Sequence, residues 1–360
     1  MQILHVTEAS WAGTFQVVRS LAAGQAARGH TVTLAYADDP RSPLDGAAGV
    51  ELIPLRWRRR SPASQLAAAR ALRRIVRERR PDVVHLHSSF AGAVGSLALP
   101  RSTRLIYTPH GFAFARSGMG RATGTLVRAV ERLVARRVAV VAGVSEAEAA
   151  LARDGLRAPR VAVVRNGIPE LDEAPPAAPA RPEPVVLAMG RVTAARRPAA
   201  TARILAALAP SARVGWIGAA EDGADAPLRE AGIPLSGWLP REQALERLAE
   251  ATVYVHWSEW DGQSLAILEA LARDVVVVAS DIAANREIVG ADLARAVLED
   301  PALRTTLLED QRRRAPQFGA RRMATEWLEL YERACSAPEG ARAPAPATPL
   351  VVPKIGDPWT

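Results

Sequence analysis

Short apolar runs alternate with helical patterns along most of this chain, and this alternation limits the folds that it can adopt. The runs QILHVT (2–7), TVTLAY (31–36) and DVVHLH (82–87) are nearly continuous in apolar character rather than alternating with polar residues. Such strands are typical of parallel sheets that helices cover on both faces. We therefore expect an α/β fold with doubly wound sheets. Further strand candidates are 50–55, 104–109, 138–144, 160–165, 185–190, 213–218, 234–239, 252–258 and 275–280.

A proline-rich segment divides the alternation into two halves. Residues 169–184 hold six prolines in sixteen positions, which excludes a regular core element there. A length of 360 residues also favours two domains over one. We predict an N-terminal Rossmann-like domain (1–168), a linker (169–184), a C-terminal Rossmann-like domain with terminal helices (185–335) and an Ala/Pro-rich tail (336–360). Because ligands of doubly wound sheets bind beyond the carboxyl ends of the strands, the cleft between the domains is the expected site.

Composition favours a protein of a reducing compartment that does not span a membrane. The single cysteine, Cys335, excludes an internal disulfide framework and a cysteine-rich metal site. The start MQILHVTEAS lacks the basic and apolar regions of a signal peptide, and no apolar run reaches the roughly 18 residues of a membrane span. The expected location is the cytoplasm, with a peripheral position at the inner face of the membrane left open.

Positive charge is concentrated in the N-terminal half. Residues 1–170 carry 25 arginines and 12 acidic residues, whereas residues 171–360 carry 21 basic and 26 acidic residues. The clusters RWRRR and ARALRRIVRERR lie within Arg56–Arg80, beside a predicted amphipathic helix. Its apolar stripe is expected to consist of Leu66, Leu72, Ile75 and Val76. Such a region suits nucleic acid, anionic lipid or phosphorylated ligands, and a solvated helix face is an equally good interpretation.

Two loops of the first domain carry candidate site residues. Gly13 stands directly before a helix that Thr14 can cap, where backbone N–H groups can approach a ligand. A tight turn is the alternative, and the pattern is not the G-x-G-x-x-G of dinucleotide-binding proteins. In YTPHGFAF, His110 follows a strand and can titrate or donate a hydrogen bond, although a structural histidine fits the same pattern. His85 and His87 share one strand face, and at least one of them is interpreted as structural.

An arginine-containing loop opens the second domain. In AMGRVTAARRP, Gly190 and Arg191 lie at a strand end, and Arg196 and Arg197 follow five and six residues after Arg191. Guanidinium groups that converge on one loop can hold a diphosphate bidentately. A basic loop exposed to solvent is the alternative.

The stretch SEWDGQSLAILEALA combines a turn with a helix start. The turn consists of Asp261, Gly262, Gln263 and Ser264, and the helix from Leu265 to about Ala272 carries Glu269. Free N–H groups and the positive dipole end at a helix start favour an anion. A hydroxyl-bearing ring beside Glu269 would fit the carboxylate.

Together these residues resemble glycosyltransferase family 4, retaining enzymes with the two-domain GT-B fold. The resemblance covers nearly the whole chain, through ILHVTEAS, RPDVVHLHSS, TPHGFAF, GVSEAEA, VRNGIP, MGRVTAARRP, SEWDGQSLAILEALA and NREIV. It implies transfer of a sugar from a nucleotide-activated donor to a hydroxyl of a glycan or lipid-linked acceptor, with retention of configuration. It also implies no cofactor, no essential metal and no nucleic acid partner, with the donor mainly in the C-terminal domain and the acceptor mainly in the N-terminal one.

The resemblance assigns roles to single residues. Arg191 matches the diphosphate-binding arginine, and Arg196 stands where a lysine is usual. Glu269 matches the second acid of the E-x7-E signature, which binds the ribose, and Asp261 takes the place of the first acid near the donor sugar. His110 matches a histidine near the transferred sugar, so His110, Asp261 and Glu269 form the expected catalytic group. The expected donor-binding residues are Gly13, Gly190, Arg191, Arg196, Gly262, Gln263, Ser264, Leu265 and Glu269.

The chain departs from the family pattern at several places. Asp261 replaces a glutamate, Ala12 replaces the first glycine of its loop, Ala283-Ala284 replaces a glycine pair, and the stretch after Gly290 is about a dozen residues short, more than ordinary loop variation. In the leading hypothesis, both arginines and the helix start at Ser264 stabilise the leaving diphosphate during same-face displacement. The departures motivate an alternative, a catalytically impaired nucleotide-sugar-binding or partner protein. A nucleotide-sugar epimerase of similar architecture is the third hypothesis, and a dinucleotide-dependent oxidoreductase is disfavoured.

Overall fold

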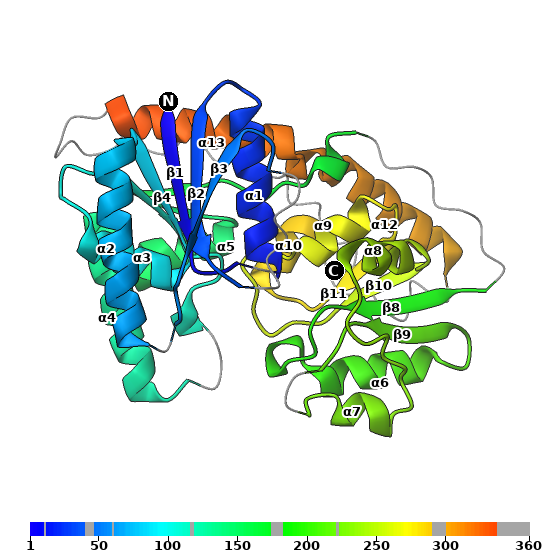
Figure 1. Cartoon of the computed structure of the whole chain (residues 1–360). Coiled ribbons are helices and arrows are strands. Elements are labelled where there is room, and N and C mark those ends of the chain that lie inside the picture. The colour runs from blue at the N-terminus through cyan, green and yellow to red at the C-terminus, as the bar shows by residue number, and fades with distance from the viewer. Residues whose placement is uncertain are drawn as a thin grey trace.

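The protein folds into two α/β domains that lie side by side, each with a sheet at its centre (Figure 1). The structure is a computed structural model that describes residues 1–10, 12–39, 47–59, 61–115, 119–173, 183–220, 223–289 and 300–336. Several predicted features lie outside these residues: most of the linker (174–182), the shortened stretch (290–299) and nearly all of the tail (337–360). The predicted fold class, with two parallel sheets in separate domains, is confirmed.

The N-terminal domain contains a seven-stranded parallel sheet with the order β3-β2-β1-β4-β5-β6-β7. Its strands are β1 (Gln2–Thr7), β2 (Thr31–Ala37), β3 (Val50–Leu55), β4 (Val83–His87), β5 (Leu105–Thr108), β6 (Val140–Gly143) and β7 (Val161–Val163). The chain runs outward from β1 to β3 and then returns to the other side of β1 as β4. In such sheets, the crevice beyond the carboxyl ends at this reversal is the usual ligand site.

Helices cover both faces of this sheet. They are α1 (Ala12–Ala26), α2 (Pro62–Arg79), α3 (Ser89–Ala98), α4 (Arg121–Arg137) and α5 (Glu146–Ala150), with the short helices η1 (Ala113–Ala115) and η2 (Leu151–Gly155). Ser61 caps α2 by accepting from Ser64 N at 3.3 Å, and Leu72 and Ile75 are buried beneath that helix. Leu66 is 52% exposed, so its assignment to the apolar stripe is wrong. At 3.6 residues per turn, it lies on the face opposite Ile75.

The C-terminal domain contains a four-stranded parallel sheet with the order β11-β10-β8-β9. Its strands are β8 (Val185–Met189), β9 (Arg213–Ile217), β10 (Val253–His256) and β11 (Val276–Ala279). Its helices are α6 (Pro198–Leu208), α7 (Ala226–Glu230), α8 (Arg241–Ala249), α9 (Leu265–Leu271), α10 (Ala283–Val289) and α12 (Pro301–Arg314), with η4 (Ala194–Arg196) and η5 (Ala315–Phe318).

The strand predicted at 234–239 does not form. This segment makes isolated bridges from Leu235 to Trp216 and from Gly237 to Gly218 instead of a ladder. Pro234 has no N–H to donate, and Gly237 has a φ of 72°, so neither residue suits a continuous strand. The apolar pattern alone did not reveal this break.

The last helix of the described chain, α13 (Ala320–Ser336), returns to the N-terminal domain. Its side chains Met323, Trp327 and Tyr331 share one buried cluster with Ile3 and Val17 of the N-terminal domain. Residues 320–335, which the prediction includes in the C-terminal domain, thus pack on the N-terminal domain, because an amphipathic pattern does not identify the surface that a helix covers. Among the described residues, no helix combines the length and the apolar character that a membrane crossing requires.

The beginning of the predicted linker is structured. Pro169–Leu171 forms the one-turn helix η3, and Leu171 is buried in the core of the C-terminal domain. Direct contacts also join the domains near this point. Glu287 of α10 accepts hydrogen bonds from the backbone N–H groups of Glu146 (2.9 Å) and Ala147 (2.8 Å) at the start of α5. A carboxylate of one domain thus caps a helix of the other.

Candidate active site

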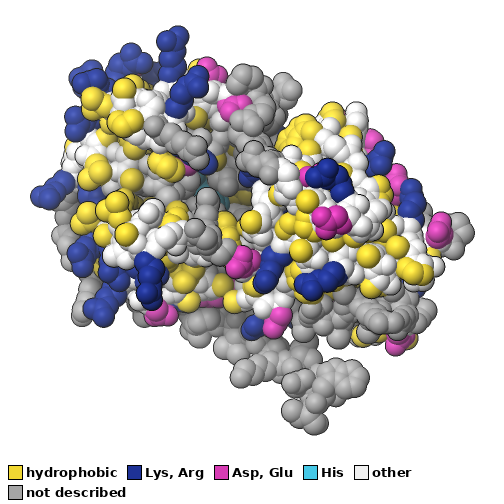
Figure 2. All heavy atoms as spheres, turned by 90° about the horizontal axis from the view of Figure 1, so that it is seen from below, with side chains coloured by type: hydrophobic (Ala, Val, Ile, Leu, Met, Phe, Trp, Pro, Cys, Tyr) yellow, Lys and Arg dark blue, Asp and Glu magenta, His cyan; other side chains and the backbone are white. Residues whose placement is uncertain are grey.

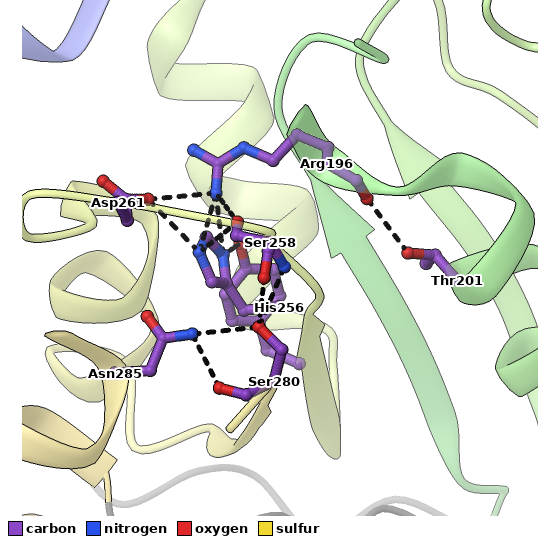
Figure 3. Close-up of polar contacts among 8 residues, drawn as sticks. Arg196, Thr201, His256, Ser258, Asp261, Ser280 and Asn285 are labelled. Atoms are coloured by element: carbon purple, nitrogen blue, oxygen red, sulfur yellow. Dashed lines mark hydrogen bonds and ion pairs between the residues drawn. The ribbon is translucent and has the colours of Figure 1, made fainter. Parts of the chain in front are cut away.

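A polar cluster lies at the carboxyl ends of β8 and β10 in the C-terminal domain (Figure 3). Arg196 ends the short helix η4, which follows β8. Its guanidinium Nη1 donates to His256 Nε2 and Ser258 Oγ, each 2.7 Å away, and to Asp261 Oδ2 at 3.2 Å. His256 is the last residue of β10, and the other two acceptors follow in the next loop. Three acceptors from one strand and its loop therefore surround a single guanidinium group.

This cluster contains one ion pair and one neutral imidazole. Burial by itself would raise the pKa of Asp261, but the charge of Arg196 and the polar contacts with His256 and the Gly262 backbone together outweigh it, and the pKa lies below its ordinary value. Burial lowers the pKa of His256 to about 4, and Arg196 adds to this shift. At pH 7, His256 is therefore neutral. It accepts from Arg196 through Nε2 and donates through Nδ1–H to the Tyr254 hydroxyl, 2.9 Å away.

Glu269 has a different arginine partner. Its Oε1 accepts from Nη2 of Arg241, the first residue of α8, at 2.8 Å. The same Nη2 lies 3.6 Å from Glu170 Oε1. Burial raises the pKa of Glu269, and the charge of Arg241 opposes that shift. The structure thus gives Asp261 and Glu269 separate ion-pair partners. Burial raises the pKa of Tyr254; the charge of Arg196 opposes this shift, and the two carboxylates add to it.

The turn between these two acids faces the N-terminal domain. The Gln263 side chain accepts from Asn166 N at 2.6 Å, so in this structure it bridges the two domains. A Cβ on Gly262 would lie 3.1 Å from Gly111 N, closer than nearly all real contacts of that kind. Ser264 Oγ is buried and has no hydrogen-bond partner among the described residues. The turn therefore combines a domain contact with one polar atom that is left for a ligand.

The remaining predicted donor-binding residues lie at two loop ends. Gly190 follows β8 with a φ of 120°, and its carbonyl accepts from Trp216 Nε1 at 2.7 Å. Arg191 is exposed on the same connection, five residues before Arg196. At the start of α1, a Cβ on Gly13 would lie 3.5 Å from the Leu265 side chain at the start of α9. Two helix starts, one from each domain, thus meet at the cleft.

His110 occupies a strained turn on the N-terminal side of the cleft. It follows β5 with a φ of 50°, and Gly111 has a φ of 95°. Two successive residues with positive φ are uncommon and need support from their surroundings. Glu148 of α5 provides it, because its Oε1 accepts from Gly111 N and its Oε2 accepts from Val144 N at 2.8 Å. Burial lowers the pKa of His110 to about 4, so the ring is neutral at pH 7.

Glu148 is a site residue that the sequence reasoning missed. It lies in the S-x-x-E pattern Ser145–Glu148, where Ser145 caps α5 by accepting from Glu148 N at 3.1 Å. A glutamate at this position normally reaches back to the backbone of the cap. Here the carboxylate bridges to the turn after β5 instead. Burial raises the pKa of Glu148 to about 7 despite the two backbone donors, and Asp261 adds to the shift.

A small cavity lies where the two sets of residues meet. It has a volume of about 150 Å³, and its lining includes Gly111, Phe112 and Glu148 of one domain and Trp260, Asp261 and Ala283 of the other. Ala284, the second alanine of the replaced glycine pair, also lines it. Figure 2 shows the hollow between the domains, with histidine atoms at its base. The structure therefore brings Asp261, Glu148 and the turn that contains Gly111 to one cleft.

One group of side chains has the composition of a metal site. Among the described residues, the ring nitrogens of His5, His85 and His87 lie close enough to one another to share an ion. Each ring already uses both nitrogens in hydrogen bonds: His85, for example, contacts the Tyr331 hydroxyl at 2.6 Å and Thr108 Oγ1 at 2.9 Å. A metal ion would have to replace these bonds, so the donor set does not favour one.

Comparisons with known proteins place both domains among glycosyltransferases. A family model described as a glycosyl transferase 4-like domain matches residues 12–167, and a model described as glycosyl transferases group 1 matches residues 183–305. A search of curated proteins found no match.

Several solved structures share the fold. Sucrose-phosphate synthase from Thermosynechococcus elongatus has a TM-score of 0.79 at 19% identity and covers 92% of this chain and 98% of its own. HepE from Anabaena, in complex with UDP-glucose, has a TM-score of 0.71 at 17% identity, with 92% and 99% covered. WaaG, a glycosyltransferase of lipopolysaccharide biosynthesis, has a TM-score of 0.70 at 15% identity, with 91% and 99% covered.

Proposed function

This chain is a glycosyltransferase of the GT-B fold, and from that premise we propose that it transfers a sugar from a nucleotide-activated donor to a hydroxyl of a glycan or lipid-linked acceptor, with retention of configuration. The observation that supports this most is the position of Arg196. Its side chain is 27% exposed, and its guanidinium lies at the carboxyl ends of the C-terminal sheet and is paired with Asp261, which lines the cavity. A cation at this place suits a diphosphate leaving group.

In the proposed reaction, Arg196 and Arg191 hold the diphosphate of the donor. Arg196 then exchanges its contact with Asp261 for contacts with phosphate oxygens, which releases the carboxylate toward the sugar. Glu269 takes the ribose hydroxyls beside its Arg241 partner, and the cleft-facing start of α9 adds the free Ser264 hydroxyl. No described side chain in the cleft is an evident covalent nucleophile. The proposal is therefore displacement on one face of the sugar, with the leaving phosphate taking up the acceptor proton.

The donor class in this proposal rests on the fold and on the cluster around Arg196. HepE was solved in complex with UDP-glucose and shares the fold of this chain over 92% of its length. A nucleoside diphosphate sugar would span from the arginines of the C-terminal domain to the cavity at the domain boundary. The experiment below is designed to identify the base and the sugar of the donor.

The acceptor side of the proposal includes contact with an anionic membrane through the Arg56–Arg80 region. Figure 2 shows apolar and basic side chains interleaved on the N-terminal domain. Exposed apolar side chains of this domain include Leu66, Leu97, Leu126 and Leu133. Basic residues beside exposed apolar side chains favour binding at a headgroup interface. Cosedimentation with vesicles that contain anionic lipid, compared with neutral vesicles, tests this contact, and equal binding to both would contradict it.

The transfer itself is tested with a mixed pool of nucleotide sugars and a panel of glycan and lipid-linked acceptors. Mass spectrometry should detect a glycosylated acceptor together with an equal amount of released nucleoside diphosphate. Donor binding without either product would favour an impaired binding protein, and a modified sugar without an acceptor product would favour an epimerase. Nuclear magnetic resonance of the product should show the anomeric configuration of the donor. An inverted product would overturn the retaining mechanism.

A further inference from the structure

A row of hydrogen-bonded histidines runs from the interior of the N-terminal domain to the cleft. His5 Nε2 contacts Gln25 Oε1 at 2.8 Å, and His5 Nδ1 contacts His87 Nε2 at 2.9 Å. His87 Nδ1 in turn contacts His110 Nε2 at 3.0 Å. The residues come from α1, β1, β4 and the turn after β5, at the strand reversal of the sheet. Gln25, His5 and His87 are almost completely buried.

Every ring in this row is neutral. Burial lowers the pKa of His5 and of His110 to about 4 and that of His87 well below its ordinary value. A neutral imidazole carries one N–H and one lone pair, so each contact in the row has one donor and one acceptor. The tautomer of one ring therefore determines the tautomer of the next.

Gln25 sets the direction of the whole row. Its Oε1 faces His5 and can only accept, so the proton of His5 is on Nε2. His5 Nδ1 is then a lone pair that accepts from His87 Nε2–H, and His87 Nδ1 accepts from His110 Nε2–H. The remaining ring nitrogen, His110 Nδ1, carries a lone pair and has no hydrogen-bond partner among the described residues. The opposite orientation of the Gln25 amide would reverse all three rings and place an N–H at this position.

The cleft end of the row is held in place independently. Glu148 binds Gly111 N and fixes the turn in which His110 has a φ of 50°. Gly111 lines the cavity, and a Cβ on it would lie 2.8 Å from the Trp260 ring of the other domain. The ring of His110 therefore has a fixed backbone on one side and a fixed hydrogen bond on the other. Its Nδ1 is the polar atom left for a ligand.

We propose that Gln25, His5 and His87 are positioning residues that hold His110 in the Nε2–H tautomer, so that Nδ1 accepts a hydrogen bond from a hydroxyl of the sugar bound in the cleft. The proposal rests on the glycosyl transfer proposed above and adds which partner donates and which accepts in the hydrogen bond between His110 and the sugar. A ligand hydroxyl must then donate at His110 Nδ1, and a group that can only accept is excluded there. Gln25 does not contact the substrate and acts through the two intervening rings.

Three variants test this assignment. Gln25→Met removes the acceptor that orients the row, and a buried N–H without a partner is costly, so the row should reverse. Gln25→Glu keeps an acceptor and should preserve the tautomer. Gln311→Met is the matched control, because it makes the same change at a buried glutamine whose amide bonds the Val277 backbone in the C-terminal domain, and it leaves the row intact. We expect kcat to fall about tenfold in Gln25→Met with little change in the donor KM, and by less than about threefold in the other two.

The tautomer itself provides a readout that does not depend on turnover. Nuclear magnetic resonance of isotope-labelled histidine distinguishes Nε2–H from Nδ1–H rings, and the His110 signals are assigned by their loss in His110→Asn. We expect Nε2–H at His110 in the wild type and in Gln25→Glu, and Nδ1–H in Gln25→Met. An Nδ1–H ring in the wild type would overturn the proposal, and so would equal kcat losses in Gln25→Met and Gln311→Met. Stoichiometric metal in the purified protein would overturn it too, because an ion would take the ring nitrogens. If no donor is turned over, the proposed function fails while the spectra still decide the tautomer.

Discussion

The two sides of the cleft are built from contrasting chemistry. In the C-terminal domain, Arg196 and Asp261 form an ion pair 3.2 Å apart at the carboxyl end of the sheet. In the N-terminal domain, the equivalent edge of the sheet carries the neutral row His5–His87–His110, with hydrogen bonds and no ion pair among its members. Both arrangements are largely buried, so the difference does not arise from exposure.

This contrast indicates which part of a substrate each side can accommodate. A partly buried guanidinium that is paired with a carboxylate can accept phosphate oxygens in place of that carboxylate, which suits a diphosphate. A row of neutral rings with fixed donor and acceptor positions offers no charge, and it discriminates between hydroxyl groups by direction. We infer that the charged end of a donor belongs to the C-terminal side and its sugar to the N-terminal side.

The largest expected effect comes from removing the charge of the C-terminal side. Arg196→Gln should lower kcat/KM for the donor by about 100-fold to 1,000-fold, because a preorganised donor to the leaving group is lost and Asp261 is left buried without its partner. Calorimetry should also show weaker binding of nucleoside diphosphate. Arg203→Gln is the matched control, since Arg203 is an exposed arginine on α6. Similar losses in both variants would show that general positive charge, and not this ion pair, carries the effect.

The next effect concerns Glu148, the carboxyl that adjoins both sides. Its pKa is about 7 in the folded protein and 4.5 when unperturbed, so protonation favours folding. The stabilising contribution is complete below pH 4.5 and is lost as the pH rises through 7. Relative to Glu148→Gln, which lacks this titration, the wild type should lose about 2.5 kcal/mol of unfolding free energy between pH 5 and pH 8. Urea denaturation of both proteins across this range measures the difference.

The contribution of other titrating groups cancels in this comparison because both proteins contain them. A constant difference between the two proteins from pH 5 to pH 8 would show that Glu148 keeps its ordinary pKa. In that case, the two backbone donors, Gly111 N and Val144 N, would outweigh burial. The N-terminal side would then carry a permanent negative charge beside its neutral histidines.

The sequence predicted the features that depend on local pattern. The strand 2–7 and the helix after Ser264 were correct because a continuous apolar run and a helix start are signalled by neighbouring residues. The position of His110 at the cleft also followed from its place after a strand. Features that depend on distant partners did not follow: α13 packs on the first domain, and Arg241 pairs with Glu269, 28 positions away.

In the candidate site too, contacts between residues distant in the sequence could not be predicted. Family resemblance placed Arg196 and Asp261 near the donor but did not indicate that they pair with each other, since that depends on how the loops after β8 and β10 approach. Glu148 was not identified from the sequence, because its partner Gly111 comes from another strand end. His5 was read as part of a strand, and its contact with His87 appears only when β1 and β4 are paired in register.

A smaller effect is expected where the two sides approach each other. Gly111→Ala places a Cβ 2.8 Å from the Trp260 ring, at a residue whose φ is 95°. We expect a loss of about 2 kcal/mol of unfolding free energy from backbone strain and overlap. Gly120→Ala is the control, because Gly120 has a φ of −56° and a Cβ there meets nothing within 4 Å. Equal stability of the two variants in thermal unfolding would mean that the domains separate freely at Trp260.

The smallest expected effect comes from lengthening the acid of the Arg196–Asp261 ion pair. Asp261→Glu restores the acid that the family pattern has at this position, yet Asp261 already reaches Arg196 at 3.2 Å and lies 3.5 Å from His256. The added methylene must fold back or displace the guanidinium, so kcat should change by less than about threefold. A large gain in sugar transfer would instead show that the short acid leaves the natural site impaired, and it would favour a binding role for this chain. The change in kcat therefore decides whether the Arg196–Asp261 ion pair belongs to an active enzyme or to a site that has lost its contact with the donor sugar.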